Sequence, residues 1–274
     1  MPASAGEALQ AARARLAAAG NPRDAGVLLA HVLACDQAAL LTHPERLLSP
    51  AESDQFESLI KRRLAYEPVQ YITGAQEFFG LSFEVTPEVL IPRPETEHLV
   101  EAVLGLADNL HILDVGTGSG AIAVALAHSL PRSRVTAVDL SPAALEVARR
   151  NAQRHGVGER VTLLQSDLLA AVHQTDFDVV VSNPPYVAEG DVLEPQVARY
   201  EPRSALYAGP TGLEIYQRLI PQARHALKPG GWLLLEIGFG QRADLQKLLS
   251  GWTSVSFKDD LQGIPRVALA QTLS

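Results

Sequence analysis

From about residue 110 to the end of the chain, short apolar runs alternate with amphipathic helical segments, and this alternation strongly limits the possible folds. Strands that are joined by helices pair in parallel, because a parallel connection needs a crossover of a dozen or more residues. We predict strands near residues 110–114, 134–139, 161–165, 177–182, 231–237, 252–258 and 264–271. The sequence therefore predicts an α/β fold built on a doubly wound, mostly parallel seven-stranded sheet.

The first 65 residues contain no strand-like runs and carry helical periodicity instead. Three helical segments stand out, namely "AGEALQAARARLAAAG", "PRDAGVLLAHVLA" and "SPAESDQFESLIKRRLAY". Gly20-Asn21-Pro22 separates the first two, and Ser49-Pro50 starts the third. The third segment ends in Lys61-Arg62-Arg63, which could form a binding patch, although a solvated helix end is the preferred interpretation.

The stretch between these two regions predicts a connecting hairpin. "EFFGLSFEV" (77–85) is typical of two short strands around Gly80, and Pro94 is placed to start a helix. We therefore expect a helical N-terminal domain at residues 1–75, a β-hairpin linker at 76–92 and the α/β domain at 93–274.

Composition narrows the class of protein. With 47% hydrophobic and 20% charged residues, a chain of 274 residues can bury a sizeable core. The net charge of −8 argues against wide contact with duplex DNA, where Lys and Arg supply most of the affinity. No apolar run reaches membrane-spanning length, and the single Cys35 excludes an internal disulfide. We expect a cytoplasmic protein with no membrane association, no direct requirement for nucleic acid and no metal site, since its histidines show no ligand spacing.

The first predicted strand of the sheet runs into the glycine-rich stretch "DVGTGSG". Gly116, Gly118 and Gly120 let the backbone turn tightly and approach a ligand before the next helix begins. The same stretch fits the dinucleotide pattern G-x-G-x-x-A through Ala121, and Asp139 ends the next strand as the acidic residue of an NAD enzyme does. An NAD-dependent oxidoreductase is therefore an open alternative.

Polar residues at three strand ends favour a different ligand. Asp114 precedes the first glycine, where it would repel a pyrophosphate. Asp167 follows the third strand, and the fourth strand ends in Asn183-Pro184-Pro185-Tyr186. Ligands of open α/β sheets lie outside the carboxyl ends of the strands, so we expect these groups at one crevice. They suit an adenosine ligand with a positive centre, for which S-adenosyl-L-methionine is the obvious candidate.

The motifs "DVGTGSG", "NPPY", "FFGLSFEV" and above all "VLIPRPETE" resemble those of the HemK/PrmC family of protein-(glutamine-N5) methyltransferases. The resemblance extends over essentially the whole chain, including "YEPRSALYAGPTGLEIYQRLI". It implies a class I, Rossmann-like fold and methyl transfer from S-adenosyl-L-methionine to the Gly-Gly-Gln glutamine of peptide chain release factors, with S-adenosyl-L-homocysteine as product. It also implies a monomer whose helical domain helps to dock the release factor. The chain departs from the family at Thr211-Gly212, where Asp-Gly is common.

The resemblance, together with the position of the loop, assigns roles to individual residues. The cofactor-binding set is Gly116, Thr117, Gly118, Ser119, Gly120, Asp139, Asp167, Leu168 and Asn183. Within it, Asp139 is expected to accept hydrogen bonds from the ribose hydroxyls, and Asp167 and Leu168 to flank the adenine. The catalytic set, which also binds the substrate, is Asn183, Pro184, Pro185 and Tyr186. Arg93 and Glu95 are expected to bind substrate by closing the crevice.

The Asn-Pro-Pro-Tyr segment suits the methylation of an amide nitrogen. The side-chain oxygen of Asn183 and the carbonyl oxygen of Pro184 would each accept one N–H of the acceptor amide. The prolines restrict the backbone, so these acceptors are in place before substrate binds. Tyr186 would form a wall of the site and exclude water. The sequence identifies no group that accepts the proton lost by the methylated nitrogen.

Other functions and simpler roles stay open at this point. A sibling enzyme that methylates a large-subunit ribosomal protein shares the loop and Asn-Pro-Pro-Tyr, but it tends to carry serine where this chain has Pro94. A DNA adenine methyltransferase acts on a similar amino group. A non-enzymatic adenosine-binding module is a further alternative. Asp139 and Asp167 could also be ordinary capping residues, and Arg93 and Glu95 a simple surface pair.

Overall fold

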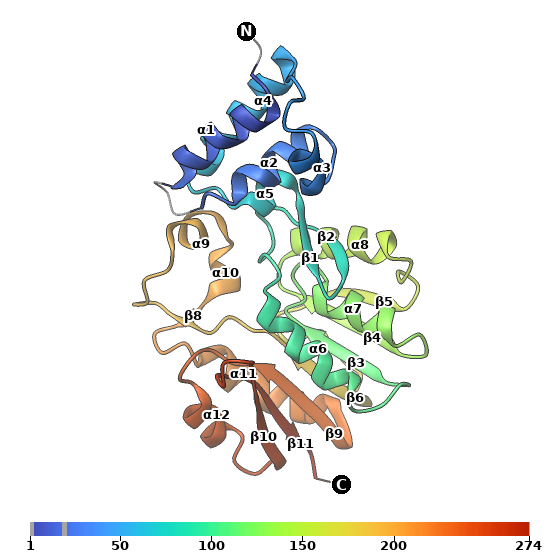
Figure 1. Cartoon of the computed structure of the whole chain (residues 1–274). Helices are drawn as coiled ribbons and strands as arrows, with labels where there is room; N and C mark the ends of the chain where they lie inside the picture. Colours follow the sequence, from blue (N-terminus) through green and yellow to red (C-terminus); the bar gives the residue numbers. More distant parts are fainter. Residues whose placement is uncertain (1–2, 18–20, 274) are drawn as a thin grey trace. The chain divides into compact units, whose positions relative to one another are not determined.

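The computed structural model describes residues 3–17 and 21–273 (Figure 1). The chain divides into two compact units. The first comprises Met1–Ala75 together with Leu193–Tyr200, and the second comprises Gln76–Val192 and Glu201–Ser274. In the described ranges, no helix is long and apolar enough to span a membrane. The first unit therefore includes a segment from far along the chain, which the sequence analysis did not anticipate.

Short helices build the first unit. They are α1 (Ala5–Ala17), α2 (Asp24–Val32), α3 (Gln37–Thr42), α4 (Pro50–Leu64), α5 (Val69–Thr73) and α9 (Pro195–Tyr200). Helix α4 begins as predicted, because the side chains of Ser49 and Glu52 each accept a hydrogen bond from the other residue's backbone N–H. The predicted break at Gly20 lies outside the described residues. Apolar faces of α1, α2 and α4 form the core of this unit around Leu29 and Ile60.

The basic end of α4 differs from the predicted solvated helix end. Only 2% of Arg63 is exposed, and its guanidinium is paired with Asp24 of α2 (Nε to Oδ2, 2.6 Å). It also donates to the backbone oxygen of Glu67 (3.2 Å) and to Oε1 of Gln196 in α9 (3.0 Å). A buried guanidinium needs such partners, because an unpaired buried charge is strongly destabilising. The prediction is wrong for Arg63, which joins three helices, whereas Lys61 is exposed as expected.

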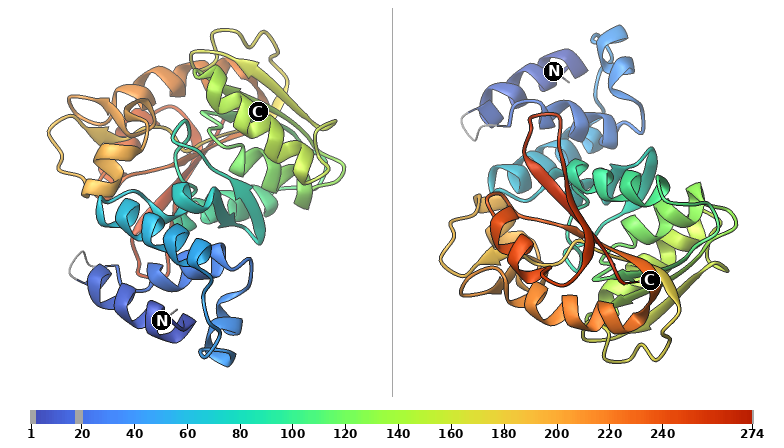
Figure 2. Two further views of the ribbon diagram at one scale, coloured as in Figure 1. Left: turned by 90° about the horizontal axis from the view of Figure 1, so that it is seen from above. Right: turned by 90° about the horizontal axis from the view of Figure 1, so that it is seen from below.

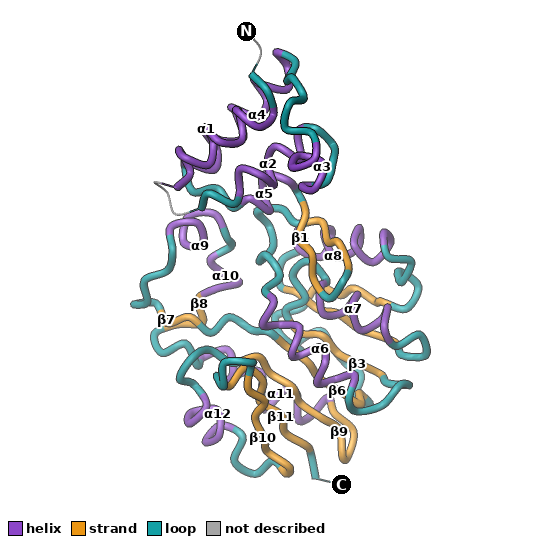
Figure 3. The backbone as a smooth tube through the Cα atoms, viewed as in Figure 1, coloured by secondary structure: helices purple, strands orange, loops and turns teal. Residues whose placement is uncertain are grey.

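The second unit is built on one seven-stranded sheet (Figures 1 and 3). In spatial order the strands are β10 (Thr253–Asp259), β11 (Pro265–Gln271), β9 (Leu227–Glu236), β6 (Phe177–Ser182), β3 (His111–Val115), β4 (Arg134–Asp139) and β5 (Val161–Gln165). The strands from β9 to β5 pair in parallel, whereas β11 is antiparallel to both β9 and β10. The predicted mostly parallel seven-stranded sheet is confirmed. Strand β9 begins earlier than expected, because Leu227 already pairs with Phe177 before an irregularity in register.

Alternate residues of the central strands pack on opposite faces of this sheet, which explains why the strands are apolar throughout. Helices α6 (Glu97–Leu104) and α7 (Ala121–Ser129) cover the face to which Ile112 and Val181 belong. Helices α11 (Glu214–Ala226) and α12 (Arg242–Leu248) cover the opposite face, to which Leu113 and Val180 belong. The further views in Figure 2 show these helices on the two sides of the sheet. Ionisable side chains of these central strands therefore lie near the strand ends.

Further elements of the second unit lie outside the sheet and the four helices named above. The predicted hairpin is present as β1 (Ala75–Phe78) and β2 (Leu81–Glu84). Pro94 begins the 3₁₀ helix η1 (Pro94–Thr96), which leads directly into α6. The other elements are α8 (Pro142–Arg154), β7 (Val187–Ala188), α10 (Arg203–Leu206) and β8 (Tyr207–Gly209).

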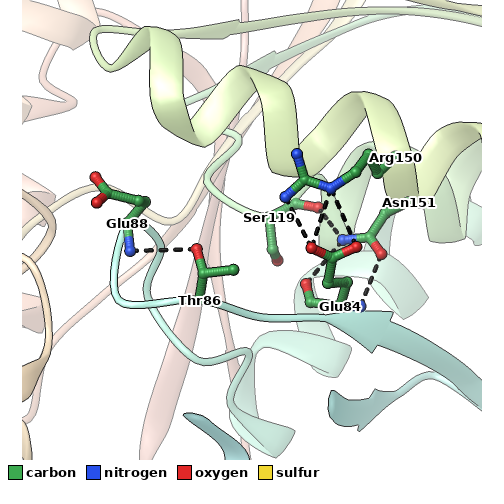
Figure 4. A network of polar contacts seen from close by, with 6 residues as sticks. All are labelled: Glu84, Thr86, Glu88, Ser119, Arg150 and Asn151. Carbon is green, nitrogen blue, oxygen red and sulfur yellow. Dashed lines mark hydrogen bonds and ion pairs between the residues drawn. The ribbon is translucent and has the colours of Figure 1, made fainter. Parts of the chain in front are cut away.

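One buried asparagine connects the hairpin to the glycine-rich loop (Figure 4). Asn151 of α8 is fully buried, and its Oδ1 accepts a hydrogen bond from the backbone N–H of Glu84 (2.7 Å). Its Nδ2 donates to the backbone oxygens of Glu84 (3.0 Å) and Ser119 (2.9 Å). The neighbouring Arg150 donates to the Glu84 carboxylate at 2.7 and 3.0 Å. The hairpin, α8 and the glycine loop therefore share one anchor.

Replacing Asn151 by alanine should lower the free energy of unfolding by about 1–3 kcal/mol, because it leaves buried backbone groups without partners. Urea denaturation measures this change. Gln153→Ala is the matched control, since it removes an exposed amide from the same helix and should change the free energy of unfolding by less than about 0.5 kcal/mol. Equal stability of the two variants would contradict the anchoring role.

Candidate active site

Several predicted site residues meet at the carboxyl ends of β3, β4, β5 and β6. A cavity of about 230 Å³ opens there, and the predicted residues that line it are Gly116, Gly118, Asp139, Asp167, Leu168, Asn183 and Pro185. The predicted residues outside its lining are Thr117, Ser119, Gly120, Pro184, Tyr186, Arg93 and Glu95. A larger hollow of about 780 Å³ lies at the amino ends of the strands, beside His111 and Arg134, and brings together none of the predicted residues.

The loop after β3 follows a backbone course that favours glycine at two positions of the cavity wall. The φ angle is +77° at Gly116 and +55° at Gly118, a region in which a side chain is strained. A Cβ atom at either position would meet nothing within 4 Å, so the backbone faces open space. At Gly120 a Cβ atom would lie 3.1 Å from that of Ala148 in α8. The first two glycines therefore expose backbone to the cavity, and the third permits helix packing.

Asp139, at the end of β4, holds the glycine loop in place. Its Oδ2 accepts a hydrogen bond from the N–H of Gly118 (2.8 Å), and its Oδ1 accepts one from the N–H of Ser141 (2.9 Å). Burial raises the pKa of this carboxyl, while the hydrogen bonds from Ser141 and Gly118 act in the opposite direction. Since a carboxylate accepts about four hydrogen bonds, Asp139 can anchor the loop and still accept from a ligand.

A second carboxyl, Asp114, lies at the end of β3 with no exposed surface. Its Oδ2 accepts a hydrogen bond from the hydroxyl of Thr117 (2.6 Å), whereas its Oδ1 has no hydrogen-bond partner in the part of the chain that the structure describes. Burial is the main cause that raises the pKa of Asp114 to about 7, and the negative charge of Asp139 adds to the effect. A cation bound at the loop would favour the charged form of both carboxyls, and a pyrophosphate would oppose it.

Asp167 and Leu168 follow β5 and line the cavity together with Arg218 of α11. Arg218 donates from Nη2 to Oδ2 of Asp167 (2.7 Å). Both side chains are about half exposed, so this ion pair contributes little to stability. Leu168 has a φ of +49°, an uncommon conformation for a residue with a side chain. The segment is therefore held in a strained turn at the rim of the cavity.

Asn183 follows β6 and is tied to the start of α6. Its Nδ2 donates a hydrogen bond to the hydroxyl oxygen of Thr96 (3.1 Å), the last residue of η1. This contact occupies the nitrogen of the side-chain amide and leaves Oδ1 for other partners. Pro184 is buried, and Pro185 lines the cavity.

Tyr186 lies beside a buried carboxyl at the end of β9. Its hydroxyl donates to Oε1 of Glu236 at 3.4 Å, which is long for a hydrogen bond. Glu236 is only 2% exposed, and burial raises its pKa to about 7. Its Oε2 has no hydrogen-bond partner within residues 3–17 and 21–273. Burial, followed by the charge of Glu236, also raises the pKa of Tyr186. The phenol is therefore neutral at physiological pH. Gly238 permits this arrangement, because a Cβ atom there would lie 3.0 Å from Cδ2 of Tyr186.

Arg93 and Glu95 do not form the simple surface pair that the sequence left open. The ion-pair partner of Arg93 in the described part of the chain is Glu201, which also accepts a hydrogen bond from the N–H of Ile91 (3.1 Å). Glu201 is 5% exposed. Glu95 is exposed, and its charge contributes to the raised pKa of Glu236. The ion pair of Arg93 therefore connects the segment before α6 to Glu201. Glu201 is the first residue of the second unit after the segment Leu193–Tyr200.

Comparisons with known proteins agree with this geometry. The PrmC N-terminal domain matches residues 7–74, and the methyltransferase small domain matches residues 95–200. The chain is 47% identical to the release factor glutamine methyltransferase of Koribacter versatilis, with 97% of each chain covered. It is 42% identical to that of Vibrio cholerae, with 96% of this chain and 95% of the relative covered. The chain belongs to the release factor glutamine methyltransferase family.

Solved structures with lower identity to this methyltransferase support its fold. The methyltransferase from Pyrococcus furiosus aligns with a TM-score of 0.55 at 23% identity and covers 78% of this chain and 98% of that one. A 16S rRNA methyltransferase of T. thermophilus, in complex with AdoMet and guanosine, aligns with a TM-score of 0.55 at 20% identity and covers 72% of this chain and 49% of that one. The second unit therefore has the class I methyltransferase fold.

Four residues that contact the site residues of this family member were not predicted from its sequence, namely Thr96, Glu201, Arg218 and Glu236. Three of them lie within the stretches quoted for the resemblance, "VLIPRPETE" and "YEPRSALYAGPTGLEIYQRLI". Glu236 carries only a weak signal, an acidic residue directly after the apolar run "LLL". An acid in that place usually marks an exposed strand end, so its burial becomes visible only in the folded chain.

The raised pKa of Asp114 should make the stability of the enzyme depend on pH. The folded state binds this proton more tightly than the unfolded chain, so the free energy of unfolding should fall as pH rises from about 4 to about 7. Asp114→Asn should remove part of this fall, on the order of 1.4 kcal/mol for each unit by which the pKa is raised. Urea denaturation near pH 5 and near pH 8 measures it. If the free energies of unfolding of the variant and the wild type differ by the same amount at both pH values, the raised pKa of Asp114 is contradicted.

Proposed function

We propose that this enzyme transfers the methyl group of S-adenosyl-L-methionine to the side-chain amide nitrogen of the glutamine in the Gly-Gly-Gln motif of peptide chain release factors. The observation that carries the proposal is the fixed amide of Asn183 at a cavity that is lined by glycine backbone and carboxylates. The names of relatives at 47% identity over nearly the full chain support this choice of substrate. S-adenosyl-L-homocysteine is the second product.

The residues around the cavity fit a cationic adenosine cofactor. Gly116 and Gly118 present backbone toward open space, where a ligand can approach closely. Asp139 is placed to accept hydrogen bonds from ribose hydroxyls, and Asp167 and Leu168 to flank the adenine. Asp114 Oδ1, which has no hydrogen-bond partner among the described residues, adds negative potential next to the loop when the carboxyl is ionised. When bound, the cofactor supplies an electrophilic methyl group on a sulfonium.

The acceptor amide has to be positioned, because its nitrogen lone pair is delocalised into the carbonyl group. Asn183 Oδ1 and the carbonyl oxygen of Pro184 accept its two N–H groups, so two acceptors meet two donors. Holding the two reactants in line lowers the barrier by roughly 7–11 kcal/mol. Tyr186 is neutral and acts as a wall that excludes water. Positioning is therefore the main contribution of these side chains.

Transfer of labelled methyl from S-adenosyl-L-methionine to purified release factors tests the proposal directly. We expect labelling of the intact release factor and none of a version whose Gly-Gly-Gln glutamine is replaced by alanine. A large-subunit ribosomal protein and duplex DNA serve as competing acceptors. Labelling of the ribosomal protein alone would assign the enzyme to the sibling activity, and labelling of DNA alone would overturn the amide acceptor.

Two substitutions should separate acceptor positioning from cofactor binding. Asn183→Ala should lower kcat by roughly 100-fold, because the acceptor is no longer held in line, and should leave cofactor affinity within a few-fold. Asp139→Ala should weaken cofactor binding by about 1–3 kcal/mol, because it removes a charged acceptor and frees the N–H of Gly118. Turnover assays and titration calorimetry measure the two effects. Wild-type turnover in the first variant or wild-type affinity in the second would contradict the assigned roles.

A further inference from the structure

Glu236 is a buried carboxyl beside Tyr186 to which the proposed function gives no task. Its Oε1 receives one long hydrogen bond, from Tyr186 at 3.4 Å, and its Oε2 receives none from the described residues. A buried charged group with unmet hydrogen-bonding capacity destabilises a fold. Its presence at this place therefore calls for an explanation.

The alternation of residues along β9 directs Glu236 toward α6. Leu234, two residues earlier in the strand, belongs to the face of the sheet that α6 covers. Thr96 directly precedes α6, and its hydroxyl lowers the pKa of Glu236 by hydrogen bonding. Because Oε2 of Glu236 has no hydrogen-bond partner among the described residues, it is available to accept a hydrogen bond from the Thr96 hydroxyl.

The Thr96 hydroxyl thus has two neighbours, Glu236 and Asn183, but only one proton to donate. An ionised carboxylate can only accept, so a Thr96 hydroxyl that donates to Glu236 has only its oxygen lone pairs left for Asn183. Asn183 must then present its Nδ2, as it does at 3.1 Å. If Glu236 did not accept this hydrogen bond, the Thr96 hydroxyl could donate to Asn183 Oδ1 instead. The side-chain amide of Asn183 would then be rotated by about 180°.

We propose that Glu236 is a positioning residue, which acts through the hydroxyl of Thr96 to fix the Asn183 amide with its oxygen toward the acceptor glutamine. This inference rests on the proposed function for the identity of the acceptor. An inverted Asn183 would face the two N–H donors of the acceptor amide with two donors of its own, and the acceptor would not be held. The relay from Glu236 through Thr96 to Asn183 therefore makes the site select an acceptor group that presents N–H donors.

The ionisation of Glu236 should accordingly appear in the pH dependence of methyl transfer. The groups that face it are Glu95 and Thr96 from η1, Tyr186 after β6, Arg266 of β11 and Tyr216 of α11, whose hydroxyl donates to the Glu236 backbone oxygen at 2.7 Å. Burial dominates and, with Glu95, raises the pKa, whereas Thr96, Tyr186 and Arg266 lower it. The relay needs the charged form, so kcat should rise as pH increases through about 7.

The enzymatic test compares wild type with Glu236→Gln, Thr96→Val and Thr96→Ser. The first two should lower kcat about 10–100-fold, flatten its rise near neutral pH and leave cofactor affinity within about 2-fold, because geometry at the acceptor is lost. Thr96→Ser retains a hydroxyl and should restore most of the activity. The double variant Thr96→Val with Glu236→Gln should be about as slow as either single variant, since both break one relay.

Thr136→Val is the matched control, because it replaces another buried threonine, in β4, to which no role is assigned. It should keep wild-type kcat and pH dependence. A Glu236→Gln enzyme with wild-type kcat would overturn the proposal. So would a slow Glu236→Gln enzyme whose rise with pH is unchanged, because the carboxyl would then serve folding alone.

A second measurement tests the relay without any methyl acceptor. In labelled free enzyme, the side-chain ¹⁵N resonance of Asn183 should shift with pH at the same midpoint as the ¹³C carboxyl resonance of Glu236. Thr96→Val should raise that midpoint for Glu236, since the hydroxyl lowers its pKa, and should abolish the shift at Asn183. An Asn183 resonance that ignores the titration of Glu236 in wild type would overturn the relay. If the coupling is present but no release factor is methylated, the proposed function fails and the relay stands.

Discussion

A sheet that is covered by helices on both faces can carry ionisable side chains only near the ends of its strands. This constraint gathers Asp114, Asp139 and Glu236 at one edge of the second unit, and burial there raises the pKa of each carboxyl. A cation or an N–H donor bound at this edge stabilises the charged form of these carboxyls, whereas a phosphate would oppose it, so the edge favours a cationic ligand. The glycine pattern is the one that binds a pyrophosphate in dinucleotide enzymes, but the carboxyls beside it would repel that group.

The geometry of this edge is fixed by contacts between segments that are remote in sequence. Asn151 joins the hairpin to the glycine loop, Asp139 joins that loop to α8, and Thr96 joins the Asn183 amide to the start of α6. Each anchor uses hydrogen bonds to backbone or to a short side chain, and such partners have few alternative conformations. The site is therefore organised before ligands bind. This organisation lowers the free energy of unfolding where a buried oxygen lacks a hydrogen-bond partner among the described residues, as in Asp114.

The local pattern of the sequence was sufficient to predict the sheet, because fully buried parallel strands must be apolar and their connecting helices amphipathic. The cavity residues Gly116, Gly118 and Asp139 followed from the same reasoning, since strand ends and the loop after the first strand are recognisable in one dimension. The burial of Arg63 was not predictable, because its partner Gln196 is more than a hundred residues away. The burial of Glu236 was not predictable for a related reason. The environment of an acidic residue at a strand end depends on which helix packs against it in the folded chain.

The course of the chain around α9 constrains how the two units can be separated by cutting the chain. The chain passes between the units three times, near residues 75, 192 and 200, because Leu193–Tyr200 belongs to the first unit. This segment begins shortly after Tyr186 and ends next to Glu201, which forms an ion pair with Arg93. The helical unit is thus built from two separate segments of the chain. A truncation after residue 75 would therefore separate α9 from the helices against which it packs. Residues 193–200 are therefore joined to the second unit at both ends, on one side by the chain that follows Tyr186 and on the other by Glu201, the partner of Arg93.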